Sequence, residues 1–226
     1  MTLNSKKEEY LIYKLADNMK NCIKIDADLF RKLDVKRGLR NEDGTGVLVG
    51  LTNIGNVVGY ERTENGLKPI EGKLYFRGYE ISDLVHAVLN EQRFGFEEIA
   101  YLLLSGGLPD AEELEQFRHL LVGNMPLMSK TMLNIVELEG TDIMNILARS
   151  VLELYTYDNT PDDISRENLM RQSVELISKF PTIIAYAYNM LRHKTFGRSL
   201  HIRHPKENFS LAENFLYMLL GNNYTP

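Results

Sequence analysis

The sequence predicts a mainly α-helical protein with a small β-ribbon near its N-terminus. Hydrophobic residues recur at helical spacing within 72–109 and over most of the chain after Pro109. Between Gly50 and Phe76, short hydrophobic runs instead alternate with turn-forming dipeptides, a pattern typical of β-strands. We therefore divide the chain into an N-terminal helical arm and loop at 1–46, a β-ribbon at 47–78 and a helical portion at 79–226.

The N-terminal arm is predicted to hold two short helices. The first runs from Lys6 to Met19, with apolar side chains four residues apart. Asp26 is suited to cap the second, which is expected to bury Leu29, Phe30 and Leu33. Each helix has little apolar surface, so the arm is expected to dock on another element. A polar loop at 37–46 and a small strand at Val47 to Val49 follow.

The ribbon is predicted from its turn formers. Asn53 to Asn56, Asn65-Gly66 and Glu71-Gly72 separate the hydrophobic runs, and Asn-Gly tolerates the positive φ that a tight hairpin requires. We expect two to four strands, too few to form a domain core.

Two amphipathic helices should follow the ribbon. The first would bury one face made of Ile81, Leu84, Val85, Val88 and Leu89, and the second a face made of Phe96, Ile99, Ala100, Leu103 and Leu104. Glu97 and Glu98 fall in the first turn of the second helix, where their negative charges interact favourably with the positive end of the helix dipole. Gly106-Gly107 and Pro109 are expected to end it.

Four further helices account for most of the remaining chain. Their predicted starts are Asp110, Pro126, Thr141-Asp142 and Ser165, and Ser210 caps a last one. The helix from Ser165 to Leu191 contains Pro181, which should kink it unless the chain restarts there. Ala148 and Ser150 are small enough for a second helix to approach closely, as at a subunit interface.

Composition limits the possible partners. The net charge is -5, so there is no global basic field for nucleic acid or an acidic membrane surface. Cys22 is the sole cysteine, which excludes an internal disulfide and agrees with a cytoplasmic location. Its thiol is interpreted as inert. The N-terminal segment lacks the apolar core of a signal peptide, and no apolar run has transmembrane length. We expect neither a nucleic-acid nor a membrane partner.

The histidines are the first candidates for chemistry. His86 and His119 are expected on the polar sides of their helices. His193, His201 and His204 share a predicted loop at 192–206 with five cations: Arg192, Lys194, Arg198, Arg203 and Lys206. These charges oppose a metal site, which needs neutral imidazoles. An anion or phosphate site is the better functional interpretation, while a solvated loop is the simplest one.

No other motif in the sequence indicates a catalytic or binding site. Gly44, Gly46 and Gly50 lack the strand before and helix after that a dinucleotide loop requires. Neither a nucleotide-binding loop with its lysine nor a zinc-protease or serine-elbow motif occurs. We therefore assign no catalytic, cofactor-binding or metal residue.

Several long motifs resemble the citrate synthase family. LYFRGYEISDLV is followed by FEEIAYLLLSGGLPDAEELEQF, and later by MNILARSVLELYTYD, KFPTIIAYAY and ENFSLAENFLYMLLG, in the family's order. The GLRNEDGTGVLVGLT segment and the basic loop resemble a bacterial, clostridial-type branch. The resemblance covers nearly all of the chain from Gly38 onward, and it implies a multi-helical, citrate synthase-like large domain, present here in part, and a homodimer.

The resemblance also implies an activity, the condensation of acetyl-CoA with oxaloacetate to give citrate. In the family, an aspartate and two histidines perform it from L-H-x-x-H, G-x-x-H-G and later segments, and these motifs do not occur here. His193, His201 and His204 do not match them, so no catalytic residue is carried over. The chain is expected to be an inactive N-terminal fragment that binds no cofactor, with acetyl-CoA a substrate of the full-length enzyme. The alternatives are a non-catalytic dimerisation or regulatory module and a 2-methylcitrate synthase.

Overall fold

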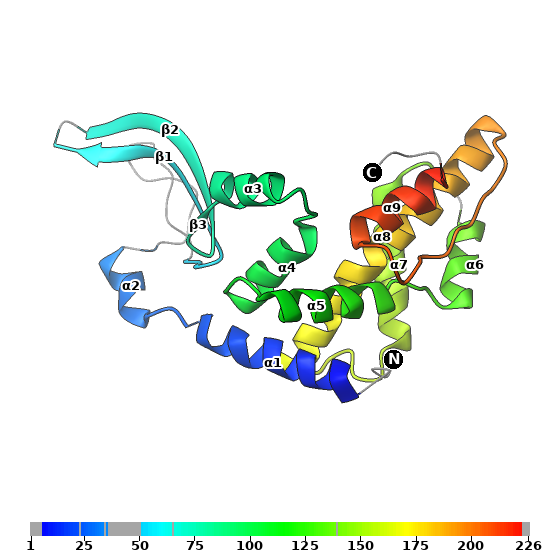
Figure 1. Ribbon diagram of the computed structural model, residues 1–226, viewed down its shortest axis with the longest axis horizontal. Coiled ribbons are helices and arrows are strands. Elements are labelled where there is room, and N and C mark those ends of the chain that lie inside the picture. The colour runs from blue at the N-terminus through cyan, green and yellow to red at the C-terminus, as the bar shows by residue number, and fades with distance from the viewer. Residues whose placement is uncertain are drawn as a thin grey trace. The chain divides into compact units, whose positions relative to one another are not determined.

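The computed structural model describes residues 6–22, 24–33, 35, 51–64, 66–138 and 140–222, and confirms a mainly helical chain with a small β-ribbon (Figure 1). Its elements are α1 (Lys6–Cys22), α2 (Ala27–Lys32), β1 (Gly55–Thr63), β2 (Gly66–Phe76), β3 (Tyr79–Glu80), α3 (Ile81–Asn90), α4 (Phe96–Ser105), α5 (Ala111–Gly123), α6 (Ser129–Glu137), α7 (Ile143–Tyr157), α8 (Arg166–Phe196) and α9 (Leu211–Leu220).

The chain forms two compact units. One consists of residues 1–16, 96–98 and 109–226, and the other of residues 17–95 and 99–108. Both α1 and α4 therefore contribute residues to each unit. The boundaries at 46 and 78 expected from the sequence remain a prediction, since the first of them falls among residues that the structure does not describe.

The N-terminal arm forms its two predicted helices. In α1, Leu11, Ile12, Leu15 and Ala16 are buried, as the helical spacing requires. The prediction that the second helix buries Leu29 and Leu33 is wrong, because both side chains are exposed and Leu33 lies just after α2. Six residues are too few to form a continuous apolar stripe. The Phe30 side chain and the loop and strand expected at 37–49 lie outside the described residues.

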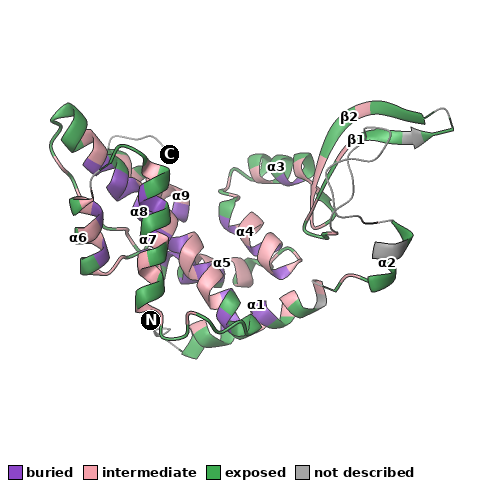
Figure 2. Ribbon diagram, turned by 180° about the vertical axis from the view of Figure 1, so that it is seen from behind, coloured by how far each residue is buried: buried purple, intermediate pink, exposed green. Residues whose placement is uncertain are grey.

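The β-ribbon is a three-stranded antiparallel sheet in the order β1-β2-β3. Its long hairpin pairs Val57 with Leu74 and Thr63 with Gly66, and the positive φ of Gly66 (107°) fits the predicted turn. The turn expected at Glu71-Gly72 is wrong, because both residues lie inside β2. Figure 2 shows most of β1 and β2 exposed, and Val57 is 78% exposed.

The two helices after the ribbon bury fewer predicted residues than expected. In α3, Leu84 is buried but Val85 and Leu89 are exposed. In α4, Phe96 is exposed, and the buried apolar side chains are those of Tyr101 and Leu102. The spacing of apolar residues predicts the positions of both helices correctly. It does not predict which side chains the neighbouring elements cover. The predicted end of α4 is confirmed at Gly106, whose φ of 87° is left-handed.

Helix α8 is the element on which the larger unit packs. It contacts α5, α6, α7 and α9. It buries apolar side chains along most of its length, including Met170, Val174, Ile183 and Tyr186. The helix continues through Pro181 without a restart and ends at Phe196, five residues beyond the predicted end at Leu191. Pro181 lacks the amide hydrogen that would bond to the Ile177 carbonyl, but burial of both halves offsets this loss.

Helices α5 and α7 begin where the sequence predicts, whereas α6 begins at Ser129, three residues after Pro126. Asp110 caps α5 in a capping box with Glu113, and Asp142 caps α7. Ser150 of α7 is buried, whereas Ala148 is exposed. None of the described helices is long and apolar enough to cross a membrane.

Candidate functional site

The basic segment is divided between a helix and a loop. The prediction of a loop over 192–206 is wrong at its start, because Arg192, His193 and Lys194 belong to the last turns of α8. There His193 Nδ1 lies 2.7 Å from the Arg198 carbonyl oxygen, and Lys194 Nζ donates a hydrogen bond of 2.9 Å to the Leu138 carbonyl. The His193 contact holds the polypeptide that leaves α8, and the Lys194 hydrogen bond joins the end of α8 to the end of α6.

The second half of the segment is anchored to α9. Asn214 is fully buried, and its Oδ1 accepts a hydrogen bond of 2.7 Å from the Lys206 amide. The Lys206 ammonium lies 4.0 Å from the Tyr217 ring centroid and 4.7 Å from that of Phe209. These contacts are favourable cation–π interactions. The Lys206 charge is thus satisfied within the fold.

A basic pocket lies between the end of α8, the following loop and the end of α9. Its volume is about 460 Å³. The residues that line it are Asn189, Arg192, Arg198, Ser199, His201, Arg203, Leu219 and Leu220. The Asn189 side chain is buried and donates a hydrogen bond of 3.0 Å to the Met218 carbonyl, which joins α8 to α9 at the base of the pocket. Three predicted basic residues of the segment are therefore brought together here.

The other histidines do not line this pocket. His86 is exposed on α3, and His119 is exposed on α5, where its Nε2 lies 3.1 Å from Glu115. His204 Nδ1 lies 3.3 Å from the Tyr186 hydroxyl. Among the described residues, no group of three or more His, Cys, Asp or Glu side chains is placed to hold a metal ion.

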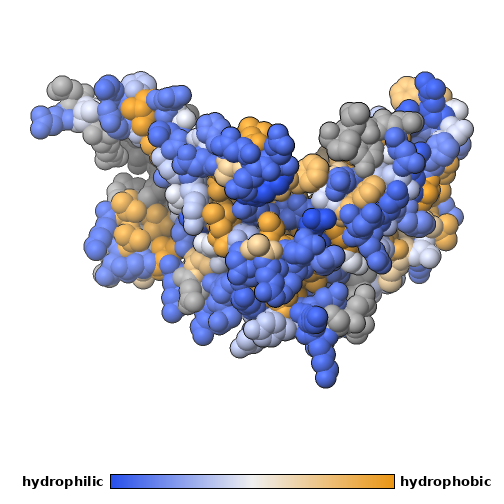
Figure 3. Space-filling model, viewed as in Figure 1, coloured by the Kyte–Doolittle hydropathy of each residue, from blue (hydrophilic) through white to orange (hydrophobic). Residues whose placement is uncertain are grey.

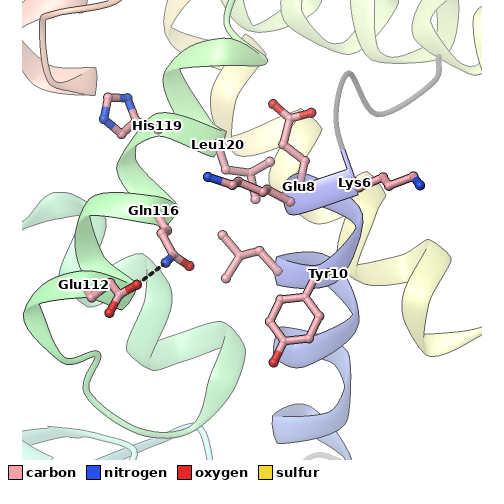
Figure 4. A pocket seen from close by; sticks show the side chains of 9 residues that line it. Lys6, Glu8, Tyr10, Glu112, Gln116, His119 and Leu120 are labelled. Carbon is pink, nitrogen blue, oxygen red and sulfur yellow. Dashed lines mark hydrogen bonds between the residues drawn. The ribbon is translucent and has the colours of Figure 1, made fainter.

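A second pocket, of about 610 Å³, lies between α1 and α5 (Figure 4). In Figure 4, Tyr10 projects from α1, and Gln116 and His119 from α5. The Gln116 amide donates a hydrogen bond of 3.0 Å to Glu112 on its own helix. The lining brings no nucleophile next to a base, so we assign it no chemistry.

An ion-pair cluster holds the loop between α7 and α8, and periodicity alone did not reveal it. Arg171 Nη2 lies 2.7 Å from Asp158 Oδ1, and Arg171 Nη1 lies 3.1 Å from Glu175 Oε1. Burial opposes ionisation of Asp158, but hydrogen bonds from Arg171 and Gln172 prevail and lower the pKa of Asp158 to about 2. The i,i+4 spacing of Arg171 and Glu175 is the one signal of this cluster in the sequence.

Lys179 is a buried charge on the same face of α8. Its residue is 2% exposed, and its Nζ lies 3.7 Å from Glu175 Oε2. Burial lowers the pKa of Lys179, and the attraction of Glu175 opposes that effect. The nearby Glu175 carboxylate is shared with Arg171, so the three side chains form a structural network along one helix.

The described chain is thus a helical scaffold packed on α8, with a β-ribbon in the other unit and a basic pocket near the end of α8. Residues 42–226 match the family model described as "Citrate synthase, C-terminal domain". This match covers more than half of the chain. The chain belongs to the citrate synthase family.

Individual relatives agree with the family match. The chain is 30% identical over 159 residues to citrate synthase 2 of Bacillus subtilis (70% of this chain, 40% of the relative). It is 27% identical over 190 residues to 2-methylcitrate synthase 1 of Corynebacterium glutamicum (84% of this chain, 43% of the relative). The chain therefore spans about two fifths of the length of these curated relatives.

Solved structures show the same fold. The crystal structure of citrate synthase from Pyrobaculum aerophilum matches with a TM-score of 0.63 and 26% identity, over 83% of this chain and 45% of that one. Citrate synthase from Thermotoga maritima matches with a TM-score of 0.56 and 26% identity, over 77% of this chain and 39% of that one. The helical, citrate synthase-like fold expected from the motifs is confirmed.

Proposed function

We propose that this chain is the scaffold part of a citrate synthase, which condenses acetyl-CoA with oxaloacetate, and that it does not catalyse the reaction by itself. The family match over residues 42–226 carries the proposal. The side chains described here support its second half. General acid–base catalysis requires a base within hydrogen-bond reach of the reacting proton. His86 and His119 are exposed helix residues, and the pocket that His119 lines places no nucleophile next to a base.

The partner we propose is a second copy of the chain. Helix α7 supports this proposal, because it leaves large apolar side chains in water. Met144 is 71% exposed and Leu152 is 73% exposed, and both lie on one stripe of the helix with the exposed Ala148. Exposed apolar patches of this kind are typical of interaction surfaces. The compartment we propose is the cytoplasm, in agreement with the single cysteine.

Two assays test the proposed activity. The purified chain, expressed in a host without its own citrate synthase, is mixed with acetyl-CoA and oxaloacetate, and release of the CoA thiol is followed. We expect no release above the background without protein. In a second assay, the chain replaces the matching segment of Bacillus subtilis citrate synthase 2, and the chimera is expected to release CoA.

The chimera separates the alternatives. A chimera that folds and associates but releases no CoA would favour a non-catalytic association or regulatory module. Turnover by the isolated chain would disprove the claim that it is inactive alone. The similarity to 2-methylcitrate synthase 1 supports a second candidate function, the synthesis of 2-methylcitrate. Both assays are therefore repeated with propionyl-CoA. If the chimera prefers propionyl-CoA to acetyl-CoA more strongly than Bacillus subtilis citrate synthase 2 does, this result would support 2-methylcitrate synthesis.

A further inference from the structure

We propose that the pocket between α1 and α5 binds a short apolar peptide, about three residues long, through its free amino and carboxyl ends. Residues between 6 and 11 of α1 form one wall of this pocket, and residues between 112 and 120 of α5 form the other (Figure 4). The family model matches from residue 42 onward, so the α1 wall lies outside the matched part of the chain. The proposal does not depend on the proposed condensation.

The first argument is the antiparallel packing of α1 and α5, which determines what lies at each end of the pocket. Lys14 Nζ lies 2.6 Å from Glu113 Oε1, near the start of α5. At the other end of α5, a Cβ added to Gly123 would lie 3.9 Å from Glu8 Oε1. The start of α1 therefore lies beside the end of α5.

The second argument is that opposite charges lie at the two ends of the pocket. Lys6 and Lys7 line the end that holds His119, and there they outnumber one acid, Glu8. In the described part of the chain, neither lysine forms an ion pair. Glu112 lines the opposite end, seven residues before His119, which corresponds to about 10 Å along a helix. A ligand with a carboxylate at one end and an ammonium group at the other is attracted at both.

The third argument is the apolar floor between these charges. Leu11 of α1 and Leu120 of α5 are 4% and 2% exposed, so the packing of the two helices holds their side chains in place. The Tyr10 ring, 67% exposed, adds an aromatic face. In Figure 3, mostly hydrophilic residues cover α1 and α5 on the side in view, which contrasts with this apolar lining. The floor suits an apolar side chain in the middle of the peptide.

The size of the pocket and its polar middle indicate a peptide. Its volume of about 610 Å³ falls within the roughly 300–1,000 Å³ of small-molecule sites. Three extended residues span about 10 Å, which matches the separation of the charges. Gln116 lies between the two ends, and its amide nitrogen donates a hydrogen bond to Glu112. The side-chain carbonyl of Gln116 is left to accept a hydrogen bond from a peptide amide, and the Glu112 carboxylate can accept further ones.

Fluorescence titration of the 226-residue chain with the tripeptide Ala-Trp-Ala tests this site. The chain contains no tryptophan, so the emission and anisotropy of the peptide report its binding without a protein background. We expect saturable binding, and binding about five- to tenfold weaker when both peptide ends are blocked by acetylation and amidation. Tyr10→Ala should also weaken binding, because the Tyr10 ring then no longer packs against the indole.

Each charged end of the pocket is tested against one end of the peptide. Glu112→Gln should weaken binding of the free peptide about three- to fivefold, but should not change binding of the N-acetylated peptide, which lacks the ammonium group. Lys6→Gln combined with Lys7→Gln should weaken binding of the free peptide and leave binding of the C-amidated peptide unchanged. These pairings distinguish a role in binding from a general effect on folding.

Tyr13→Ala is the matched control, because Tyr13 is also an exposed tyrosine of α1 but does not line the pocket. Far-UV circular dichroism verifies that each variant is folded, and the charge variants provide the test if Tyr10→Ala is not. Three results would overturn the proposal: no saturable binding, equal binding of the free and doubly blocked peptides, or equal losses in Tyr10→Ala and Tyr13→Ala.

Discussion

The Glu97 carboxylate accepts a hydrogen bond of 2.8 Å from the backbone amide of Leu211, 114 residues later in the chain. Glu97 lies in the first turn of α4 and is 3% exposed, and Leu211 is the first residue of α9. The Ser210 and Glu213 amides use local partners, because these two residues form a capping box. One buried acid therefore ties the start of α4 to the start of α9.

Replacing Glu97 should destabilise the larger unit. Glu97→Ala leaves the buried Leu211 amide without its acceptor, which costs about 1–3 kcal/mol, whereas Glu97→Gln retains an acceptor oxygen and should lose less. Urea unfolding followed by circular dichroism measures the free energy of unfolding of both variants. Glu167→Ala is the matched control, since Glu167 also lies in a first helical turn but is exposed. Equal losses for Glu97→Ala and Glu167→Ala would contradict the capping role.

Asp158 should make stability depend on pH in the acid range. Its folded-state pKa of about 2 is lower than its ordinary value of 3.8, so its contribution is present above pH 4 and is lost as the pH falls towards 2. The shift corresponds to a free energy on the order of 2 kcal/mol. Asp158→Asn should lower the free energy of unfolding by about that amount at pH 7, and by much less at pH 2.

Urea unfolding of both proteins between pH 2 and pH 7 measures this difference. Asp17→Asn, at an exposed position on α1, is the control and should change the free energy of unfolding by less than about 0.5 kcal/mol. If the free energies of unfolding of Asp158→Asn and the parent chain differed by the same amount at every pH from 2 to 7, the lowered pKa of Asp158 would be refuted.

Gly106 should resist substitution for two separate reasons. Its φ of 87° is unfavourable for any residue with a Cβ, and a Cβ placed there would overlap the Cys22 side chain. Gly106→Ala is expected to cost about 1–2 kcal/mol from the backbone alone, and more from the overlap. Cys22→Ala in the same chain removes the sulfur but keeps the Cβ at 2.7 Å, so it should recover only the part of the stability loss that the sulfur causes.

Thermal unfolding of the two single variants and the double variant separates these contributions. Gly107→Ala is the neighbouring control, because a Cβ there meets no atom within 4 Å. If Cys22→Ala restored none of the stability lost in Gly106→Ala, overlap with the Cys22 sulfur would not be the cause of that loss.

Arg77 should stabilise the smaller unit through its side chain. Its Nη2 donates a hydrogen bond of 2.9 Å to the Leu103 carbonyl near the end of α4, and its Nη1 donates one of 3.0 Å to Asn53 Oδ1. Arg77→Ala should lower the free energy of unfolding by about 1.5–3 kcal/mol, and Arg77→Lys should restore less than half, because an ammonium cannot span both acceptors.

Hydrogen exchange of the β1 and β2 amides reports on this unit. Lys68→Ala is the control, since Lys68 is exposed and pairs with Glu61 at 3.4 Å. Full protection of these amides in Arg77→Ala would show that the guanidinium does not stabilise the unit.

The exposed stripe on α7 should control self-association. Met144→Glu with Leu152→Glu places two charges on the proposed contact and should convert a dimer to a monomer in sedimentation velocity. Leu133→Glu, at an exposed leucine on α6, should leave the dimer intact. A monomeric parent chain at high concentration, or a dimer that survives both α7 changes, would exclude this surface.

Local patterns in the sequence located most of the described helices. Capping residues such as Asp110, Asp142 and Ser210 act within a few residues, so the starts of α5, α7 and α9 could be predicted from the chain alone. The family could also be predicted, because its motifs are contiguous segments. The turn preference of Glu71-Gly72 produces only an irregularity inside β2, because pairing with β1 resumes on both sides of it, at Lys73 with Val58 and at Pro69 with Tyr60.

What only the tertiary structure decided is which side chains are covered and which charges meet. Glu97 was expected to serve the dipole of its own helix, but the fold buries it against α9, and Val85 and Leu89 were expected inside but are exposed. The basic pocket likewise needs the end of α9 beside the arginines that follow α8. Periodicity depends on spacing along one helix, whereas burial and ion pairing depend on neighbours distant in sequence, which no local pattern encodes.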